Sequence, residues 1–516
     1  MKQSKKKYSI ICDVLREAAM NGNAYLPTRE LIDHCCNRNS KTSERRLFAE
    51  LDVQIQEGTV IADGERLYLS ANYRYEEASA VVLSALLAQN AQTLPRNFEA
   101  ALASTAPYFP IALTEEQQDG IRNCMSNRLS IISGGAGSGK TTLVFALWLT
   151  HQILSPDTNV LLCAPTGKAS RNLQQKTHHE AHTVHRILGM TPDSDFLNGG
   201  NAASFWKSTE MVVVDEASML TLEMLTGLLM RAAEGCHVVL IGDTHQLLSV
   251  GAGNVLDDLL ALGVPHTHLK SNHRQAEDTN ALYHNVSQLT EKWGTTLEFD
   301  DSFQLKLAYS HEQAWQEICE CYLAEQSAGS SVQVLSPYRS ASYASAQNLS
   351  KRIQAITNPP AENKLQMKRS GKLYRDGDKV ILTKNTNNFC NGDMGILQLD
   401  HIAPEVLRFE VRFGNRIAHG TTTEILELLD LAYAITIHKS QGSEYDVIIV
   451  PILKEFERML TQNLLYTAIS RARRKVILVG DADALEKAMA TAPPRRNSAL
   501  VEKTMRRLAA KLKKPA

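Results

Sequence analysis

GGAGSGKT, residues 134–141, is the stretch that decides the fold of this chain. It fits the pattern G-x-x-x-x-G-K-[ST], in which glycines let backbone N–H groups wrap around phosphates. The apolar run RLSII precedes it, and the apolar helical pattern TTLVFALWL follows it. A strand, this loop and a helix in that order bind phosphate groups at the positive end of the helix. The stretch therefore predicts a nucleotide site in a parallel α/β domain.

Four short apolar runs rich in β-forming residues share one design around this loop. They are RLSIISG (128–134), NVLLCAP (159–165), MVVVDEA (211–217) and HVVLIGD (237–243). Each run ends in residues able to do chemistry, and helical patterns separate the runs. Buried parallel strands have this pattern and place function at their carboxyl ends.

A second set of such runs follows later in the chain. Its members are SVQVLSPY (331–338), YAITIHKSQG (433–442), DVIIVPIL (446–453) and KVILVGD (475–481). The repetition predicts two parallel α/β domains in tandem.

Two further regions differ in texture from these domains. Residues 365–430 are rich in β-forming residues and in Asn-Gly or Gly-Asp turns, which predicts a small inserted β-barrel. In the first 110 residues, helical patterns precede TVIADGERLYL (59–69), where Asp63-Gly64 is a hairpin turn signal. Helices followed by a hairpin predict a winged-helix-like module, and a docking domain that never touches nucleic acid is the alternative.

Composition sets the outer limits on function. A chain of 516 residues suggests roughly three or four domains of about 150 residues each. A net charge of −1 argues against a wholly basic nucleic-acid coat, although not against a basic channel. Two basic clusters lie near the ends of the chain, and we expect them to be solvated helix faces, with phosphate contacts as the alternative. They are KKK at residues 5–7 and the group Lys503, Arg506, Arg507, Lys511, Lys513 and Lys514. Nine cysteines without a CxxC pair, together with no long apolar run, predict a cytoplasmic protein with reduced thiols.

The runs beside the phosphate loop supply candidate catalytic groups. Lys140 is expected to reach the β- and γ-phosphates, and Thr141 to hold Mg²⁺ through its hydroxyl. Asp215 is expected to bind Mg²⁺ directly or through water, and Glu216 stands beside it to polarise the attacking water. Gln246, at the end of the next strand, is placed to contact the γ-phosphate and couple it to the neighbouring domain, with a polar cap of the strand end as the alternative.

Positive charge on the transition state is a further requirement of phosphoryl transfer. Arg274 in SNHRQ and Arg471 in YTAISRAR are the candidates, with surface salt bridges as the alternative. Arg471 lies in the second domain, so a contribution from it makes hydrolysis depend on closing the cleft between domains.

Nine motifs occur in an order that is specific to one family. They are LTEEQQ (113–118), GGAGSGKT (134–141), APTGKASRNL (164–173), AHTVHRILG (181–189), VVDEASM (213–219), GDTHQLLSVGAGNVLDDL (242–259), HRQ (273–275), AITIHKSQGSEYD (434–446) and LLYTAISRARRKV (464–476). Together they resemble superfamily 1 DNA helicases of the 5′-to-3′ branch. More narrowly they resemble the RecD-like family, related to the exodeoxyribonuclease V alpha chain. The resemblance covers residues 111–516, and more loosely YLSANYRYEEASAVVLSALL (68–87).

The resemblance implies two RecA-like domains with an ATP cleft between them and single-stranded DNA across their tops. The expected units are an N-terminal module (1–110), a first RecA-like domain (111–275), a second (276–364 and 431–516) and an SH3-like barrel (365–430). A pin-like insertion that separates the duplex is expected at 189–205.

Residue roles also follow from the resemblance. The phosphate cradle comprises Gly134, Gly135, Ala136, Gly137, Ser138, Gly139, Lys140, Thr141 and Thr142. Gln117 is expected to read adenine, Glu444 to approach the ribose and Gly442 to lie near the γ-phosphate. The DNA contacts are Pro165, Thr166, Lys168, Thr183, His185, Thr436, His438, Lys439 and Ser440. Phosphate contacts of this kind suit nonspecific single-strand binding.

The sequence departs from the family pattern in two places, and two other functions remain alternatives. Ser470 stands where the family often has threonine, and the N-terminal region is short, which puts partner docking by a longer module in doubt. No acid-rich nuclease constellation is evident, so DNA cleavage is not predicted. An ATP-gated DNA-binding subunit of a larger recombination or repair complex is the main alternative to a helicase. An RNA helicase is another, because the motor core alone does not distinguish the sugars.

THHEAHTVHR (177–186) carries four histidines, which raises the alternative of a metal site. The zinc-protease pattern H-E-x-x-H is not met, and a third ligand at suitable spacing is not evident. We expect the side chains of His178 and His179 to be solvated, in the stretch that leads into AHTVHRILG. Thr183 and His185 are expected to belong to the motor, with a structural role as the alternative for His185.

Overall fold

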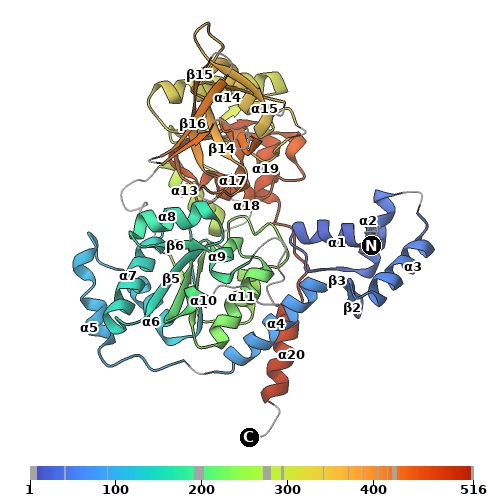
Figure 1. The fold of residues 1–516 in the computed structure, drawn as a ribbon, viewed down its shortest axis with the longest axis vertical. Coiled ribbons are helices and arrows are strands. Elements are labelled where there is room, and N and C mark those ends of the chain that lie inside the picture. Colours follow the sequence, from blue (N-terminus) through green and yellow to red (C-terminus); the bar gives the residue numbers. More distant parts are fainter. Residues whose placement is uncertain are drawn as a thin grey trace.

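The structure is a computed structural model with two sheet-centred bodies and a module at the side (Figure 1). It describes residues 9–39, 42–89, 91–190, 203–270, 280–291, 296–340, 342–369, 371–386, 389–403, 406–414, 416–420 and 427–512. The predicted pin (189–205) lies largely outside the described residues, and so does Arg274.

The first body contains a six-stranded parallel sheet of order β6-β5-β7-β8-β4-β9. Its strands are β4 (Leu129–Gly134), β5 (Asn159–Ala164), β6 (Ala181–Thr183), β7 (Thr209–Val214), β8 (His237–Gly242) and β9 (His266–Leu269). Its helices are α5 (Phe98–Ala103), α6 (Glu115–Ser126), α7 (Lys140–Leu154), α8 (Gly167–Thr177), α9 (Val184–Leu188), α10 (Ala203–Trp206), α11 (Leu222–Ala233) and α12 (Val255–Ala261), with short 3-10 turns at Ala106–Tyr108 and Ala217–Met219. All six residues of β4 are buried, as expected for a strand covered on both faces.

The second body holds a parallel sheet of order β10-β21-β20-β11-β19. Its strands are β10 (Phe303–Leu307), β11 (Val332–Ser336), β19 (Ala434–Thr436), β20 (Tyr445–Ile452) and β21 (Ala472–Gly480). Its helices are α13 (Ala281–Glu291), α14 (His311–Ser327), α15 (Ala346–Thr357), α17 (Ile437–Ser440), α18 (Gln462–Ile469) and α19 (Ala482–Ala490), with a 3-10 turn at Lys454–Phe456. The prediction of two tandem parallel α/β units is confirmed, and every apolar run quoted for it contains a strand.

The β-rich segment expected at 365–430 forms antiparallel structure with its own core (upper part of Figure 1). A hairpin of β12 (Gln366–Arg369) and β13 (Lys372–Arg375) precedes a sheet of order β17-β16-β15-β14-β18. The strands of that sheet are β14 (Lys379–Leu382), β15 (Met394–Ala403), β16 (Val406–Phe413), β17 (Arg416–Gly420) and β18 (Leu429–Leu431). Buried Tyr374, Leu397 and Phe409 fill the core between these strands.

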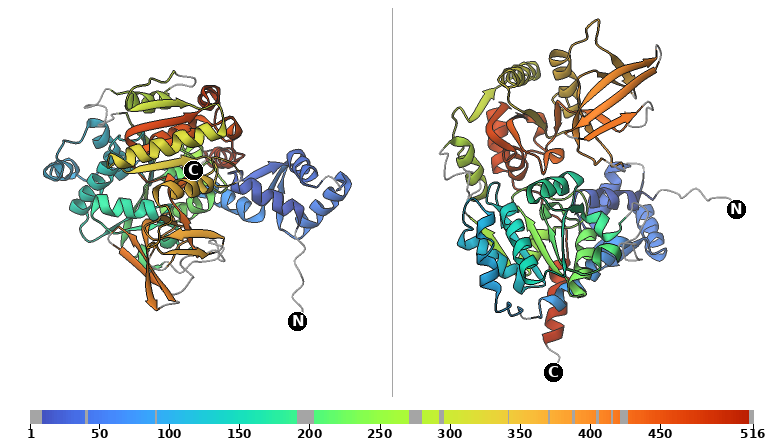
Figure 2. Two further views of the ribbon diagram at one scale, coloured as in Figure 1. Left: turned by 90° about the horizontal axis from the view of Figure 1, so that it is seen from above. Right: turned by 60° about the vertical axis from the view of Figure 1, so that its left-hand side comes forward.

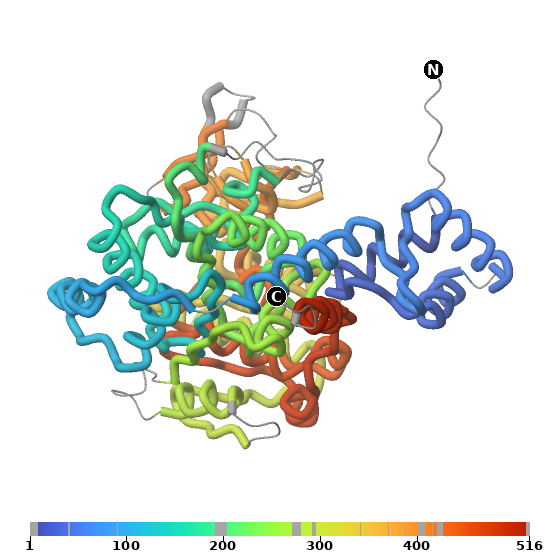
Figure 3. The backbone as a smooth tube through the Cα atoms, turned by 90° about the horizontal axis from the view of Figure 1, so that it is seen from below, coloured from blue at the N-terminus to red at the C-terminus, as the bar shows by residue number. Residues whose placement is uncertain are grey.

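The N-terminal module projects from the first body (Figures 2 and 3). Its elements are α1 (Ile10–Met20), β1 (Tyr25–Pro27), α2 (Thr28–Arg38), α3 (Glu44–Gln56), β2 (Val60–Asp63), β3 (Arg66–Leu69) and the long α4 (Ser70–Leu86). The strands form an antiparallel sheet of order β1-β3-β2. The predicted turn joins β2 to β3, and Gly64 adopts the positive φ of 62° that favours glycine there.

The C-terminal helix α20 (Leu500–Leu512) leaves the second body and returns to α4 and α12 (Figure 3). Leu500 joins the hydrophobic core of the first body. Lys503 is 3% exposed, and its ammonium lies 3.2 Å from Glu76 and 3.0 Å from Glu77. The prediction of a solvated face is therefore wrong for Lys503, because buried Glu76 requires a neighbouring cation.

Membrane-spanning structure was searched for among the described residues. None of their helices has the length and apolar character needed to cross a bilayer.

Candidate active site and nucleic-acid interface

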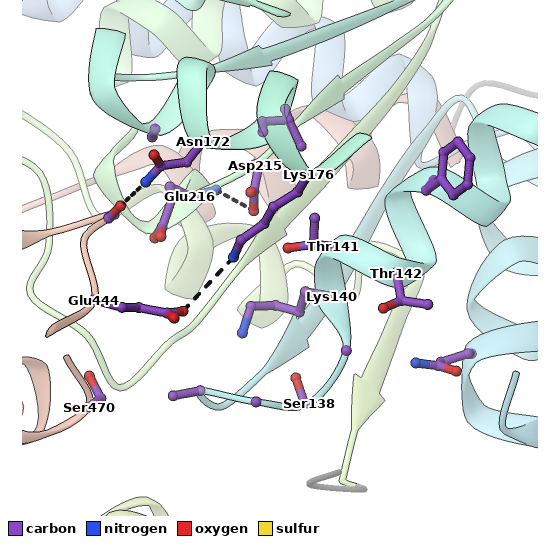
Figure 4. Close-up of a pocket in the computed structure, with 18 of the residues that line it drawn as sticks. Ser138, Lys140, Thr141, Thr142, Asn172, Lys176, Asp215, Glu216, Glu444 and Ser470 are labelled. Carbon is purple, nitrogen blue, oxygen red and sulfur yellow. Dashed lines mark hydrogen bonds and ion pairs between the residues drawn. The ribbon is translucent and has the colours of Figure 1, made fainter. Parts of the chain in front are cut away.

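A pocket of about 540 Å³ opens between the two parallel sheets (Figure 4). The first body contributes the loop before α7, helix α8 and the ends of β7 and β8, and the second contributes residues just before β20 and β21. The predicted site residues on its lining are Gln117, Ala136, Gly137, Ser138, Gly139, Lys140, Thr141, Thr142, Asp215, Glu216, Gln246, Gly442, Glu444 and Arg471. Gly134 and Gly135 lie in the same loop, at and just after the end of β4.

The loop before α7 has the backbone that its glycines predict. Gly137 and Gly139 have φ values of 85° and 79°, a region that side chains disfavour. A Cβ atom on Gly134 would lie 2.4 Å from the Ser138 hydroxyl and 3.1 Å from the Leu269 carbonyl oxygen, so a larger residue there would force the loop to shift. The Lys140 ammonium donates to the carbonyls of Gly134 and Gly135, both at 2.7 Å, which holds it over the loop.

The acidic pair follows β7 directly. Glu216 adopts a left-handed φ of 55°, which is uncommon outside glycine and marks a constrained position. Its backbone N–H donates to the Asp215 carboxylate at 2.9 Å, which holds the Asp215 side chain against the turn at Glu216 (Figure 4). Burial raises the pKa of both carboxyl groups, and the Lys140 ammonium opposes that shift.

Asp243 is a site residue that the sequence analysis missed. It follows β8, is 1% exposed and accepts hydrogen bonds from the Tyr466 hydroxyl (2.7 Å) and the Gln246 amide (3.2 Å). Burial alone would raise the pKa of Asp243, but hydrogen bonds from His245 and Tyr466 and the nearby Lys140 ammonium hold it at about 2. The sequence could have identified Asp243, because it ends the apolar run HVVLIGD and functional residues follow the carboxyl ends of parallel strands.

Gln246 is buried beside this carboxylate. Its side-chain nitrogen is bound to Asp243, whereas its side-chain oxygen has no partner among the described residues. Because Gln246 lines the pocket, that oxygen is available to accept a hydrogen bond there.

The second body brings a buried arginine and a carboxylate to the pocket. Arg471, 5% exposed, donates to the Thr467 carbonyl and the Ser470 hydroxyl, both at 3.2 Å. Glu444 lies 3.9 Å from the Lys176 ammonium of α8 (Figure 4). This ion pair joins α8 of the first body to the segment before β20 of the second.

The other end of the pocket has an apolar lining that the sequence analysis did not assign. Phe109, Ile111 and Phe145 line it, and the rings of Phe109 and Phe145 meet edge to face at 5.6 Å. Gln117 lies there with its side-chain oxygen accepting the Thr114 N–H at 3.0 Å, in a capping box that opens α6. The amide nitrogen of Gln117 remains available to a ligand in the pocket.

Three threonines predicted to contact DNA occupy equivalent positions. Thr166 lies shortly after the end of β5, whereas Thr183 and Thr436 are the last residues of β6 and β19. Each hydroxyl oxygen accepts a backbone N–H of the following helix, at 3.2, 3.3 and 3.3 Å respectively. A hydroxyl used in this way as an N-cap keeps its own O–H group to donate.

The remaining candidate DNA contacts differ in exposure. His185 is exposed, Pro165 is buried, and His438 and Lys439 are half-buried. Ser440 is fully buried and donates to the Ile437 carbonyl at 2.7 Å.

Two candidate lysines lie near groups of the second body. The Lys168 ammonium lies 5.9 Å from the centre of the Tyr445 ring, between the two bodies. The Lys439 ammonium lies 4.0 Å from Asp430.

The histidines of THHEAHTVHR do not converge. His178 ends α8 in a left-handed conformation and is exposed, as expected. His179 is half-buried and stacks on Trp148 with centroids 3.5 Å apart, so the expectation of a solvated side chain is wrong for it. His182 is buried against Phe205. Over the part of the chain that the structure describes, no cluster of His, Cys, Asp and Glu could hold a metal ion.

Comparison with known proteins places this geometry in a family context. A family model described as an AAA domain matches residues 112–299, and one described as a UvrD-like helicase C-terminal domain matches residues 431–479. The chain is 31% identical over 465 residues to the ATP-dependent RecD2 DNA helicase of Deinococcus radiodurans, covering 88% of this chain and 61% of that protein. It is 29% identical over 408 residues to the RecBCD enzyme subunit RecD of Mycolicibacterium smegmatis, covering 71% of each.

The chain thus spans 61% of the length of the first of these relatives. Among solved structures, Bacteroides Pif1 bound to single-stranded DNA aligns with a TM-score of 0.46 and 20% identity, over 75% of this chain and 95% of that one. The two curated relatives confirm the resemblance to the RecD-like proteins that the nine motifs carry.

Proposed function

Because this chain is a relative of the RecD-like helicases, we propose that it is an ATP-dependent DNA helicase that moves 5′ to 3′ on single-stranded DNA. One observation carries the proposal. A single pocket brings the phosphate loop and acidic pair of the first body together with Arg471 of the second. Hydrolysis that needs groups from both bodies is sensitive to their relative position, which is the coupling a translocase requires.

ATP fits the pocket along its length. The amides of residues 136–141 cradle the phosphates at the start of α7, and Lys140 reaches the β- and γ-phosphates. Gly442 lies beside the γ-phosphate and Glu444 beside the ribose. The adenine packs against Phe109 and Phe145, and Gln117 reads its edge through the amide nitrogen that the capping box leaves available.

Mg²⁺ suits the acidic side of the pocket. The Thr141 hydroxyl and the Asp215 carboxylate are the oxygen ligands that this ion prefers, and both line the pocket. When bound, the ion neutralises charge on the phosphates. It would also keep the Asp215 carboxyl group, whose pKa burial raises, in its ionised form.

Hydrolysis is assigned to groups from both bodies. Glu216 polarises the attacking water, and the unpartnered side-chain oxygen of Gln246 accepts one of its hydrogens. Arg471 stabilises the charge that develops on the transferred phosphoryl group. Arg274, outside the described residues, remains a second candidate for that role.

Single-stranded DNA is placed across the carboxyl ends of β5, β6 and β19. Thr166, Thr183 and Thr436 donate their free O–H groups to successive phosphates. The other proposed contacts are Pro165, Lys168, His185, His438 and Lys439. Ser440 is fully buried and its hydroxyl donates to Ile437, so we assign it a supporting role beneath these contacts. Contacts to phosphates rather than to base edges suit a motor that must move over any sequence.

Architecture is proposed in the same terms. We assign residues 111–275 to one RecA-like domain, and residues 276–364 and 431–490 to a second. The C-terminal bound, predicted at 516, moves to 490 because α20 packs against α4 and α12. Residues 1–110 form a winged-helix-like module, for which the element order α1-β1-α2-α3-β2-β3 is the support. Residues 365–430 form an SH3-like barrel, for which the antiparallel five-stranded sheet is the support.

A second candidate is an ATP-gated DNA-binding subunit of a larger recombination complex. The RecD relative is by its name a subunit of the RecBCD enzyme, which favours this alternative. Such a subunit would hydrolyse ATP on single-stranded DNA with little unwinding of its own.

Unwinding of tailed duplexes by the isolated chain, with ATP and Mg²⁺, separates these functions. We expect separation of duplexes with a 5′ single-stranded tail and no separation of those with a 3′ tail. Hydrolysis without unwinding of the 5′-tailed duplex would instead support the subunit. Stimulation of hydrolysis by single-stranded RNA and not by DNA would move the assignment to an RNA helicase.

A further inference from the structure

The Tyr466 side chain lies at the boundary of the two bodies, where the mechanism above gives it no role. It belongs to α18 of the second body and is fully buried. Its hydroxyl accepts the Ala136 N–H at 3.3 Å and donates to Asp243 at 2.7 Å. One hydroxyl of the second body therefore touches both the phosphate loop and the end of β8.

The Asp243 carboxylate connects the Tyr466 hydroxyl to Gln246. The same carboxylate oxygen, Oδ2, accepts from the Tyr466 hydroxyl and from the Gln246 amide nitrogen. A carboxylate held by two donors fixes the direction of each, so the Tyr466 hydroxyl helps to set the Gln246 side chain. The oxygen of that Gln246 amide is the buried atom without a partner.

The next residue anchors the same loop in the second body. The Leu247 side chain belongs to the hydrophobic core of the second body, although its chain segment follows β8 of the first. The Leu247 N–H donates to the Thr467 hydroxyl at 2.8 Å, and its carbonyl accepts from the Gln441 amide at 2.9 Å. Gln246 is thus held between Asp243, bound by Tyr466, and Leu247, bound by the neighbouring Thr467.

We infer that Tyr466 is a positioning residue for ATP hydrolysis, whose hydroxyl ties the phosphate loop to Gln246 through the Asp243 carboxylate. The inference rests on the proposed ATPase function. Ala136 belongs to the loop whose amides wrap the phosphates, so a nucleotide competes with the Tyr466 hydroxyl for that N–H. The hydroxyl couples occupancy of the loop to the placement of Gln246, and movement of α18 alters both contacts together.

Tyr466→Phe removes only the hydroxyl, and the chain offers a matched control. Tyr433 is also buried in the second body, and its hydroxyl donates to the buried Asp378 carboxylate at 3.0 Å, away from the pocket lining. Tyr433→Phe therefore loses the same kind of bond. Any general cost of losing a tyrosine–carboxylate bond appears in both variants when their thermal unfolding is compared.

DNA-stimulated ATPase kinetics of the full chain test the inference. We expect Tyr466→Phe to lower kcat by about 10- to 100-fold, since a misplacement of about 1 Å at a reacting centre has such an effect. KM for ATP should not rise by more than about 3-fold, because the lost hydroxyl only competed with the nucleotide for the Ala136 N–H and the Gln246 position is used in the transition state. Tyr433→Phe should retain the kcat of the wild-type chain.

A double-mutant cycle with Gln246→Ala distinguishes positioning from a general structural role. If Tyr466 acts through Gln246, adding Tyr466→Phe to Gln246→Ala should lower kcat no further. Multiplicative losses in the double variant, or equal kcat in Tyr466→Phe and Tyr433→Phe, would overturn the inference and leave the ATPase assignment intact. A wild-type chain without any DNA-stimulated hydrolysis would overturn the proposed function and the inference together.

Discussion

The two parallel sheets of this chain are built alike but face the pocket with opposite ends. In the first sheet, the phosphate loop, Asp215 and Asp243 follow the carboxyl ends of β4, β7 and β8. In the second, Glu444 and Arg471 precede the amino ends of β20 and β21. The carboxyl end of β19 instead carries Thr436 and leads to the candidate DNA-binding residues.

The difference assigns separate tasks to similar architectures. Carboxyl ends of parallel strands meet the N-termini of the following helices, which favour phosphate. In the proposed mechanism the first sheet uses the carboxyl ends of β4, β7 and β8 for the nucleotide and those of β5 and β6 for DNA, whereas the second sheet uses the carboxyl end of β19 for DNA alone. At the amino ends of its strands the second sheet instead presents the Arg471 guanidinium. We expect this cation to stabilise the transition state of phosphoryl transfer more than the bound ground-state phosphates.

The largest expected effect tests the carboxyl end of the first sheet. Lys140→Ala should abolish ATP hydrolysis, because the ammonium over the phosphate loop is lost, and should leave single-stranded DNA binding in place. Lys270→Ala is the control, since Lys270 follows the carboxyl end of neighbouring β9 and is exposed. Hydrolysis at the wild-type rate in Lys140→Ala would show that the nucleotide does not bind at the carboxyl end of the first sheet.

The next effect tests the amino end of the second sheet. Arg471→Ala should lower kcat for hydrolysis by about 100- to 1,000-fold, because charge stabilisation in the transition state is lost. Binding of ATP, measured by a fluorescent analogue, should weaken far less. Arg474→Ala serves as control, since Arg474 lies on β21 and bonds to Ser330 on the surface. Equal losses in kcat and in nucleotide affinity would make Arg471 a ground-state ligand.

The contrast between the sheets also explains what the sequence could predict. Strands such as β4 and β20 are continuous apolar runs, and the residues after them are visible as motifs. Strands β6 and β9 are three and four residues long and carry histidines, so no periodicity identifies them. The carboxyl-end rule found Asp215 in the first sheet, but it gives no reason to expect function before β20 or β21. Glu444 came only from the family resemblance.

Contacts between distant segments were beyond the reach of any local pattern. The Tyr466 hydroxyl meets Ala136 330 residues away and Asp243 223 residues away. Lys503 pairs with Glu76 because α20 returns to α4, although the sequence assigned the whole C-terminal segment to the second domain. In each case a polar group is buried, and its partner is set by tertiary packing rather than by spacing.

A smaller effect tests whether DNA follows the carboxyl end of β19. Lys439→Ala should weaken single-stranded DNA binding and reduce the slope of log affinity against log salt by about 0.7, the value for one phosphate contact. Lys306→Ala is the matched control, because Lys306 is exposed on β10, the opposite edge strand of the same sheet. An unchanged slope in Lys439→Ala would move DNA off this end of the sheet.

The smallest effect concerns the Thr436 hydroxyl, which caps α17 and is proposed to donate to a phosphate as well. Thr436→Val removes both interactions at nearly constant shape, and the lost cap should lower the free energy of unfolding by about 1 kcal/mol. Thr436→Ser keeps the hydroxyl and should preserve both stability and DNA affinity. If valine lowers the melting temperature but leaves DNA affinity at the serine level, the hydroxyl is only a cap. Thr436 would then orient Lys439 through the cap without contacting DNA itself. The carboxyl end of β19 would resemble that of β4 in shape but would not bind phosphate through Thr436.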